Sequence, residues 1–248
     1  MKRTRVVDDE VFNFQQFVIH QGHAAMKVGT DSDLLGALSE GGSRVLDIGT
    51  GTGVLALMMA QRFPEAQITA VEIDDLAVLD AARNFSESRF ADRIELVHAS
   101  FQDFLSSCET GGAALFDAVV CNPPYFERSL ECPSESRTRA RHTSSLPFSV
   151  LIDGSYRLLH DGGTLSVCIP PEVMDDFLSQ CRQTGFSLQH LYKIKTVPEK
   201  QPKRFILVCR KGEEQETVEH VFCMRNSDRT RSEWYRALMQ DFLICGEL

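Results

Sequence analysis

The sequence has no apolar run that approaches the roughly 20 residues needed to cross a bilayer. A secretion signal needs a basic start that leads into an apolar segment. Residues 1–5 are basic, but the acidic residues 8–10 follow them instead of a hydrophobic stretch. We therefore expect a cytoplasmic protein with no membrane partner.

The sequence also lacks any Cys-x-x-Cys pair among its eight cysteines. Cysteines at that spacing are the usual sign of a zinc site or a redox motif. Cys121, Cys168 and Cys209 lie inside apolar runs, where a free thiol behaves as a small hydrophobic residue. We expect reduced, mostly buried thiols and no metal site.

Positive charge is scarce, with 26 Lys and Arg against 35 Asp and Glu and a net charge of −9. A nucleic-acid partner needs positive potential, but only where it binds. Basic residues gather in two places, within residues 193–211 and shortly after residue 136. Each cluster fits a solvated surface as well as it fits an RNA-binding track. The residues of the RNA-binding alternative are Arg137, Arg139, Arg141, Lys193, Lys195, Lys200, Lys203 and Arg204.

At 248 residues the chain suits one α/β domain. Apolar runs predict strands at residues 44–48, 67–72, 94–98, 116–121 and 164–169, and helices at 54–62, 75–89 and 148–159. This alternation predicts a mostly parallel twisted sheet with helices on both faces. Residues 186–196 and 205–210 have no helix between them and predict an antiparallel C-terminal strand pair. A further strand at 218–224 and a helix capped by Ser232 complete the domain, which we place at residues 41–248.

A glycine loop, Gly-Thr-Gly-Thr-Gly at residues 49–53, joins the first of these strands to a helix. Glycines let the backbone turn tightly and approach a ligand, and the helix start offers unpaired N–H groups. The spacing differs from the dinucleotide fingerprint and is weak by itself. Asp47 before the loop is expected to orient it or to accept a bond from an amino group, and Glu72 ends the next strand, where a carboxylate accepts ribose hydroxyls. A nucleoside with free 2′ and 3′ hydroxyls is therefore the expected ligand; the plain alternative is a glycine turn beside two surface acids.

These residues resemble the class I S-adenosylmethionine methyltransferases. The resemblance implies a Rossmann-like fold and S-adenosyl-L-methionine as cofactor, with the glycine loop against its methionine and ribose parts. Members of that class often carry an acid after the third strand to meet the adenine, and Ser100 stands there in this sequence, followed by Phe101. The expected cofactor-binding residues are Asp47, Gly49, Thr50, Gly51, Gly53, Glu72, Ile73, Ser100, Phe101 and Asn122.

Asn122, Pro123, Pro124 and Tyr125 directly follow the fourth predicted strand and are the expected catalytic residues. Ligands of an open α/β sheet bind at the carboxyl ends of its strands, so this tetrad and the glycine loop should share one crevice. The prolines stiffen the turn, Asn122 adds an amide acceptor, and Tyr125 adds a flat face. Acceptors fixed in advance stabilise the positive charge that develops on a planar amino nitrogen during methyl transfer. The tetrad alone does not distinguish adenine N6, guanine N2 and a glutamine amide, and a simple proline turn is the bland alternative.

Larger parts of the chain resemble the bacterial tRNA(Val) adenine-37 N6-methyltransferases. The resemblance rests on residues 12–17, 25–31, 122–126, 131–132 and 140–143. It implies methylation of the adenine 3′ of the anticodon of a valine tRNA. It also implies that the N-terminal segment, residues 1–40, closes over the cofactor through Lys27, Gly29, Thr30 and Asp31. From the residues alone, Thr30 and Asp31 are interpreted as helix caps and the phenylalanines of residues 12–17 as an edge strand.

Three other functions remain open: a glutamine N5 protein methyltransferase, a guanine N2 rRNA methyltransferase and a non-catalytic RNA-binding protein that keeps the cofactor fold. Glutamine methyltransferases usually carry a sizeable helical domain before the glycine loop, and the 46 residues ahead of Asp47 are too few for one. Asn122, Tyr125 and the glycine loop argue against a non-catalytic protein. We expect a monomer that binds the anticodon loop of tRNA.

Overall fold

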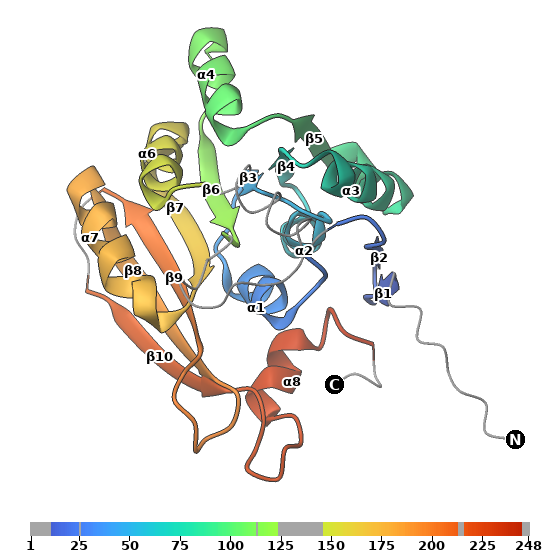
Figure 1. Cartoon of the computed structure of the whole chain (residues 1–248), viewed down its shortest axis with the longest axis vertical. Coiled ribbons are helices and arrows are strands. Elements are labelled where there is room, and N and C mark those ends of the chain that lie inside the picture. The colour runs from blue at the N-terminus through green and yellow to red at the C-terminus, as the bar shows by residue number, and fades with distance from the viewer. Residues whose placement is uncertain (1–10, 25, 113, 124–145, 213–215, 245–248) are drawn as a thin grey trace, which may run out of the picture.

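Parallel strands alternating with helices organise the first two thirds of the fold (Figure 1). The computed structural model describes residues 11–24, 26–112, 114–123, 146–212 and 216–244. The strands are β1 (Val11–Asn13), β2 (Val18–His20), β3 (Arg44–Ile48), β4 (Gln67–Glu72), β5 (Ile94–His98), β6 (Phe116–Cys121), β7 (Leu159–Ile169), β8 (Phe186–Lys195), β9 (Arg204–Lys211) and β10 (Val218–Cys223). The α-helices are α1 (Thr30–Leu38), α2 (Val54–Arg62), α3 (Asp75–Glu87), α4 (Phe101–Gly111), α6 (Phe148–Leu158), α7 (Met174–Thr184) and α8 (Glu233–Met239).

Eight of these strands form one sheet in the order β10-β8-β9-β7-β6-β3-β4-β5. The neighbours from β7 to β5 are parallel, β9 is antiparallel to both β7 and β8, and β10 runs parallel to β8. The mostly parallel sheet and the antiparallel C-terminal pair are therefore confirmed. The carboxyl ends of β3, β4 and β6 meet at one edge, which positions the residues after them side by side.

Helices cover both faces of the sheet, as predicted, and each face has its own apolar core. One core gathers α1, α2 and α3, with Leu34, Leu57 and Phe85 among its buried side chains. The other gathers α4, α6 and α7, with Phe104 and Phe177 in it. The central strands are apolar almost throughout because both of their faces are buried.

The N-terminal phenylalanines differ from the expectation of an edge strand. β1 and β2 form a separate two-stranded antiparallel sheet outside the main one, so the phenylalanines cover the core, as expected, but from this hairpin and not from an edge of the main sheet. The rings of Phe14 and Phe17 stack at 4.5 Å between centroids and are buried in the core under this hairpin. Phe14 also forms a bridge with Leu243, so the hairpin closes against the C-terminal end of the described chain. Burial of these rings and backbone contacts both hold the hairpin in place, since the Gln15 amide also donates to the Phe242 carbonyl at 2.8 Å.

Several local expectations also change. The N-cap of α1 is Gly29, so Thr30 and Asp31 are the first helical residues and their interpretation as caps is wrong. The sequence pattern did not predict α4 or α7, and β7 begins at Leu159 instead of Thr164. Ser232 caps α8 as expected and accepts a hydrogen bond from the Tyr235 amide at 3.1 Å.

All six described cysteines are free thiols, and four of them are buried: Cys121, Cys168, Cys181 and Cys209. Among the described residues, no helix combines the length and the apolar character needed to span a bilayer.

Candidate functional site

A cavity of about 460 Å³ opens at the carboxyl ends of β3, β4 and β6. It brings together residues that lie far apart in the sequence, from Ala24 in the segment before α1 to Leu146 just before α6. Nine of the expected cofactor residues line it: Lys27, Gly49, Thr50, Gly51, Glu72, Ile73, Ser100, Phe101 and Asn122. Five expected cofactor residues do not line the cavity: Gly29, Thr30, Asp31, Asp47 and Gly53. Of these, Gly53 ends the glycine loop and Asp47 lies beneath it, so both help to shape the loop.

The glycine loop turns through a left-handed backbone at Gly49 and Gly51, where φ is 70° and 58°. A Cβ built on either residue would meet no heavy atom within 4 Å. The positive φ angles favour glycine at both positions. The open space beside them leaves room for a ligand close to the backbone. The Gly49 and Thr50 amides donate to the Val71 carbonyl at 2.8 and 3.1 Å, which ties the loop to β4.

Asp47 lies beneath this loop and is completely buried. Its Oδ2 accepts the Thr50 hydroxyl at 2.5 Å and the Ala56 amide at 3.1 Å, so the carboxyl group joins the loop to the first turn of α2. Within the described chain, Oδ1 has no hydrogen-bond partner. Burial raises the pKa of Asp47 to about 7, because a buried carboxylate loses its hydration. The expectation that Asp47 orients the loop agrees with this geometry.

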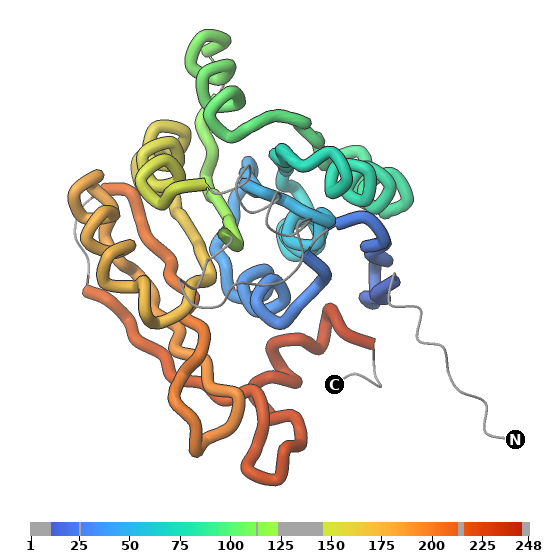
Figure 2. The backbone as a smooth tube through the Cα atoms, viewed as in Figure 1, coloured from blue at the N-terminus to red at the C-terminus, as the bar shows by residue number. Residues whose placement is uncertain are grey.

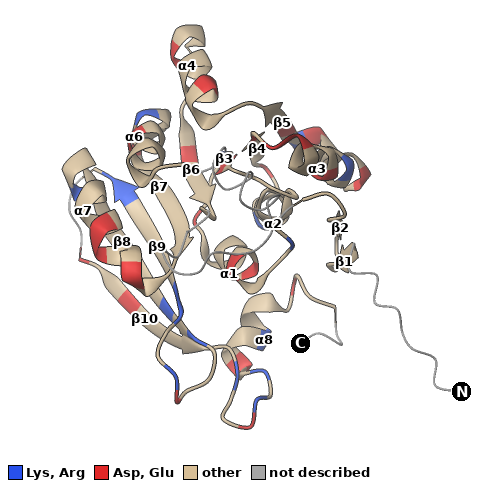
Figure 3. Ribbon diagram, in the orientation of Figure 1, with Lys and Arg blue, Asp and Glu red and all other residues tan. Residues whose placement is uncertain are grey.

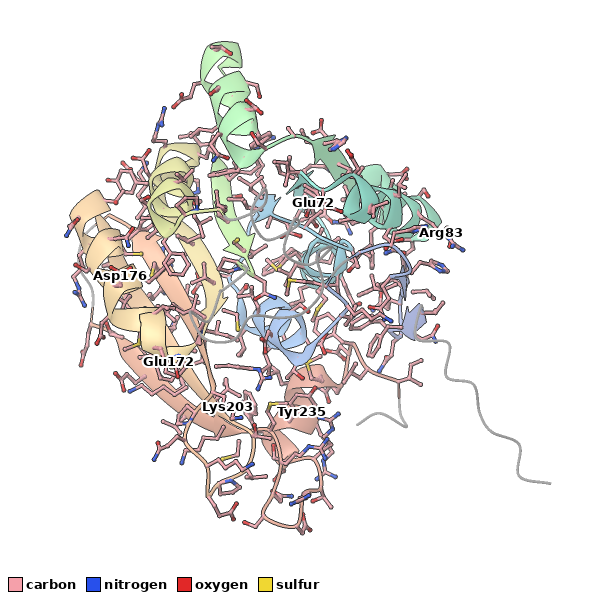
Figure 4. The ribbon with its side chains drawn as sticks, viewed as in Figure 1. Glu72, Arg83, Glu172, Asp176, Lys203 and Tyr235 are labelled. Carbon is pink, nitrogen blue, oxygen red and sulfur yellow. The ribbon has the colours of Figure 1, made fainter. Side chains whose placement is uncertain are left out.

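Glu72 holds the other side of the loop (Figure 4). Its Oε2 accepts the Gly51 amide at 2.8 Å, and its Oε1 accepts the amides of Ile73 and Asp74 at 2.8 and 2.9 Å. A carboxylate has about four acceptor sites, so a site on Oε2 remains for a ligand hydroxyl. Glu72 is buried but lines the cavity, the position that a ribose contact requires.

A short strap before α1, of which the structure describes residues 23, 24 and 26–28, contributes Ala24, Met26, Lys27 and Val28 to the cavity wall. Asp80 of α3 anchors the strap. Its carboxylate accepts the amides of His23 and Ala24 at 2.9 and 2.8 Å and contacts the His23 ring nitrogen Nδ1 at 2.7 Å. At the other end of the strap, Gln21 accepts the Val28 amide at 2.8 Å. The strap is therefore held by α3 at one end and by Gln21 at the other.

Asn84 of α3 extends this anchoring to the loop itself. Its side chain donates to the carbonyls of His20 and Thr52, both at 2.9 Å, and accepts the His20 amide at 2.8 Å. Asp80 and Asn84 are both buried, four residues apart on one helix face. Sequence reasoning missed them, because polar residues on an amphipathic helix are usually solvent-exposed and no pattern separates these two from the others.

Ser100 stands after β5, where members of the class often carry an acid, and it is hydrogen-bonded to Asp103. Ser100 caps α4 by accepting the Asp103 amide at 3.1 Å, and its hydroxyl donates to the Asp103 carboxylate at 2.6 Å. Ser100, Phe101 and Gln102 line the cavity, whereas Asp103 supports Ser100 from behind. Gln102 is a further polar lining residue that sequence reasoning did not identify.

Asn122 and Pro123 follow β6, and Asn122 lines the cavity together with Cys121. The tetrad and the glycine loop therefore share one crevice as far as Asn122. Pro124 and Tyr125 lie outside the described residues.

Asp31 and Arg204 form an ion pair that joins the first turn of α1 to the start of β9. Both residues are thus engaged within the fold: Asp31 precedes Ser32, which lines the cavity, and Arg204 belongs to the basic segment 193–211. This contact fixes α1 against the C-terminal strands.

The remaining residues of the RNA-binding alternative fall into three groups. Arg137, Arg139 and Arg141 lie outside the described residues. The Lys193 amine donates to Glu219 at 2.6 Å, and the Lys195 amine donates to the Pro198 carbonyl at 3.2 Å. Lys200 and Lys203 are exposed in the loop between β8 and β9.

Comparison with protein families matches residues 22–178 to the model of the methyltransferase small domain. A protein of Phocaeicola vulgatus, named tRNA1(Val) (adenine(37)-N6)-methyltransferase, is 41% identical over 235 residues, which cover 94% of this chain and 97% of the relative. A protein of the same name from Shewanella woodyi is 36% identical over 94% of this chain and 98% of its own length.

Solved structures share the fold at lower identity. A predicted O-methyltransferase of Agrobacterium tumefaciens superposes with a TM-score of 0.64 at 19% identity, over 86% of this chain and 96% of that one. A T. thermophilus 16S rRNA N2 G1207 methyltransferase in complex with AdoMet and guanosine gives a TM-score of 0.53 at 21% identity, over 79% of this chain and 47% of that one. The fold is that of the class I methyltransferases.

Replacing Asp80 by alanine should loosen the strap and weaken the binding of S-adenosylmethionine by tenfold or more. Hydrogen bonds to a charged group contribute about 1.5–3 kcal/mol, and about 1.4 kcal/mol corresponds to a factor of ten in affinity. Calorimetric titration measures the effect, with Asp75→Ala, an exposed acid on the same helix, as the control. Equal affinities of Asp80→Ala and the wild type would contradict the anchoring role.

Replacing Asp47 by asparagine should change how stability depends on pH. The folded protein retains the Asp47 proton up to about pH 7, whereas an unfolded chain releases it near its ordinary pKa of about 3.9. Unfolding therefore releases a proton in this window, and this group lowers the free energy of unfolding as pH rises from about 4 to about 7. Urea unfolding across that range should show Asp47→Asn gaining stability relative to the wild type, with no further gain above pH 7; a constant difference would refute the buried proton.

Proposed function

The chain belongs to the family of tRNA1(Val) (adenine(37)-N6)-methyltransferases, and we propose that it transfers a methyl group from S-adenosylmethionine to N6 of adenine 37 in a valine tRNA. The observation that carries the proposal is the shared cavity. Asn122 at the end of β6, Glu72 at the end of β4 and the glycine loop line the same space. A hydrogen-bond acceptor for an amino group and a binding site for a nucleoside are thus adjacent.

The cavity residues suit the cofactor. The open space beside Gly49 and Gly51 admits a ligand close to the backbone, and Oε2 of Glu72 keeps an acceptor site for a ribose hydroxyl. Ile73 and Phe101 offer apolar surface for the adenine ring, and Ser100 offers a polar contact beside it. When bound, S-adenosylmethionine supplies an electrophilic methyl group on a positively charged sulfur.

The chain's own groups then position the amino nitrogen that receives the methyl group. The lone pair of an exocyclic amine is delocalised into its ring, so the amine is a weak nucleophile. The Asn122 side-chain carbonyl and the Pro123 carbonyl accept its two N–H bonds and stabilise the positive charge that builds on nitrogen. Fixing the nitrogen beside the cofactor removes the entropic cost of an encounter, and the proton leaves to solvent afterwards. Tyr125 supplies a stacking face in this proposal.

The target base must leave its stack to enter the cavity. Unstacking a base costs a few kcal/mol and less in a loop than in a duplex, which suits an anticodon-loop adenine. The proposal includes a monomeric enzyme that acts on valine tRNA in the cytoplasm and needs no metal. Within the described chain, no three His, Cys, Asp or Glu side chains form a metal-binding group.

Incubation with methyl-labelled S-adenosylmethionine separates this function from its rivals. Unmodified tRNA, unmodified rRNA and total cell protein are offered in parallel reactions, and label in rRNA alone would favour a guanine N2 methyltransferase. Label is expected in tRNA and absent from protein. Label in protein alone would favour a glutamine methyltransferase, and no label in any polymer would favour a non-catalytic RNA-binding protein.

Replacing Asn122 by alanine should lower the turnover number by a factor of about 10² to 10³, because a fixed acceptor at the reacting atom is lost. Binding of S-adenosylmethionine should change by only a few fold, since Glu72 and the glycine loop remain. Single-turnover methylation of tRNA and calorimetric titration of the cofactor measure the two effects. Asn13→Ala, which removes an exposed asparagine from β1, is the control, and full turnover in Asn122→Ala would remove the acceptor role.

A further inference from the structure

Two basic loops lie side by side at the end of the sheet formed by β8, β9 and β10 (Figure 2). One joins β8 to β9 through residues 196–203, and the other joins β10 to α8 through residues 224–232. The Met224 amide donates to the Lys195 carbonyl at 2.9 Å, and the Arg225 amide donates to the Thr196 carbonyl at 3.0 Å. The Ser227 hydroxyl also donates to Glu199. We call residues 195–203 and 225–231 the two-loop surface; these bonds make it one unit.

The two-loop surface is positively charged in a protein whose net charge is −9. It carries six basic residues, Lys195, Lys200, Lys203, Arg225, Arg229 and Arg231, against two acids, Glu199 and Asp228. Figure 3 shows the basic residues on both loops. Both acids are engaged within the surface: Glu199 accepts from Ser227, and Asp228 accepts the Thr230 amide at 2.9 Å and hydroxyl at 2.6 Å. The basic side chains therefore dominate what a partner meets.

The second loop presents its arginines from a tightly bonded turn. The Asn226 amide donates to the Thr230 carbonyl and the Arg229 amide donates to the Asn226 carbonyl, both at 2.9 Å. The Arg225 guanidinium donates to the Arg229 carbonyl at 2.9 Å, and the Arg231 guanidinium lies 4.7 Å from the centre of the Tyr235 ring. Arginines braced in this way lose little additional freedom when they bind an anion.

Arg229 at the tip of this turn is the one non-glycine residue with a positive φ, 69°, in the part of the chain that the structure describes. Glycine or asparagine adopts this left-handed backbone at lower energetic cost. The turn therefore carries an exposed cation at a position where the backbone conformation favours an uncharged residue, glycine or asparagine. Strain of this kind at an exposed position indicates a use for the side chain.

We propose that the two-loop surface binds the phosphate backbone of tRNA, with Arg225, Arg229 and Arg231 contacting phosphates beside Lys200 and Lys203. This proposal rests on the proposed function. RNA phosphates suit this surface because, in protein–nucleic acid complexes, much of the affinity comes from Lys and Arg side chains that displace counterions from the phosphate backbone. Phosphate contacts also orient the nucleic acid without reading its sequence, which lets the target loop enter the cavity.

Arg229→Gly tests the surface without damaging the fold. Glycine relaxes the left-handed backbone, so the melting temperature should stay the same or rise. The loss of one phosphate contact should reduce the slope of log affinity against log salt by about 0.9, which corresponds to about a fivefold weaker tRNA affinity near 0.15 M salt. The turnover number at saturating tRNA and the affinity for S-adenosylmethionine should match those of the wild type.

Two controls complete the experiment. Arg229→Lys keeps the charge and should retain the wild-type salt slope, and Arg83→Gln removes an exposed cation from α3, well away from the two loops, and should leave the slope unchanged (Figure 4). A wild type that methylates tRNA, combined with an Arg229→Gly variant of unchanged affinity and slope, overturns the two-loop surface alone. A wild type that neither binds nor methylates tRNA overturns the proposed function, and the surface with it.

Discussion

The carboxylate of Glu72 is the contact on which the site depends. It accepts amides from the glycine loop and from the turn after β4, so it joins the ends of two neighbouring strands at the point where their helices begin. Asp47 braces the same loop from below, through Thr50 and the first turn of α2. The two acids therefore have different roles. Asp47 is enclosed beneath the loop and is structural, whereas Glu72 lines the cavity and keeps an acceptor site for a ligand.

Further contacts spread outward from this loop. Asn84 bonds both to Thr52 of the loop and to His20 of the N-terminal hairpin, and Asp80 holds the strap that contributes to the cavity wall. The ion pair of Asp31 with Arg204 then connects α1 to β9, next to the basic loops. Separate polar contacts thus hold the elements around the proposed cofactor site and fix α1 beside the proposed RNA surface.

Much of the fold and part of the site could be predicted from the sequence, since hydrophobic periodicity and glycine spacing are local signals. The strands of the sheet, the glycine loop and the position of Asn122 after β6 all follow from short patterns. The anchoring roles of Asp80 and Asn84 and the pairing of Arg204 could not be predicted, because they join residues more than 30 positions apart. The hairpin of β1 and β2 was misassigned for the same reason: its alternating phenylalanines match an edge strand, and tertiary packing decides otherwise.

The central claim, methyl transfer to adenine N6 in the anticodon loop, is tested most directly by naming the modified atom. Unmodified valine tRNA is incubated with the protein and S-adenosylmethionine, cut by a base-specific nuclease, and its fragments and nucleosides are identified by mass spectrometry. We expect N6-methyladenosine in the fragment that contains position 37 and nowhere else in the tRNA. A methyl group on guanine N2, or on an adenine outside the anticodon loop, would contradict it.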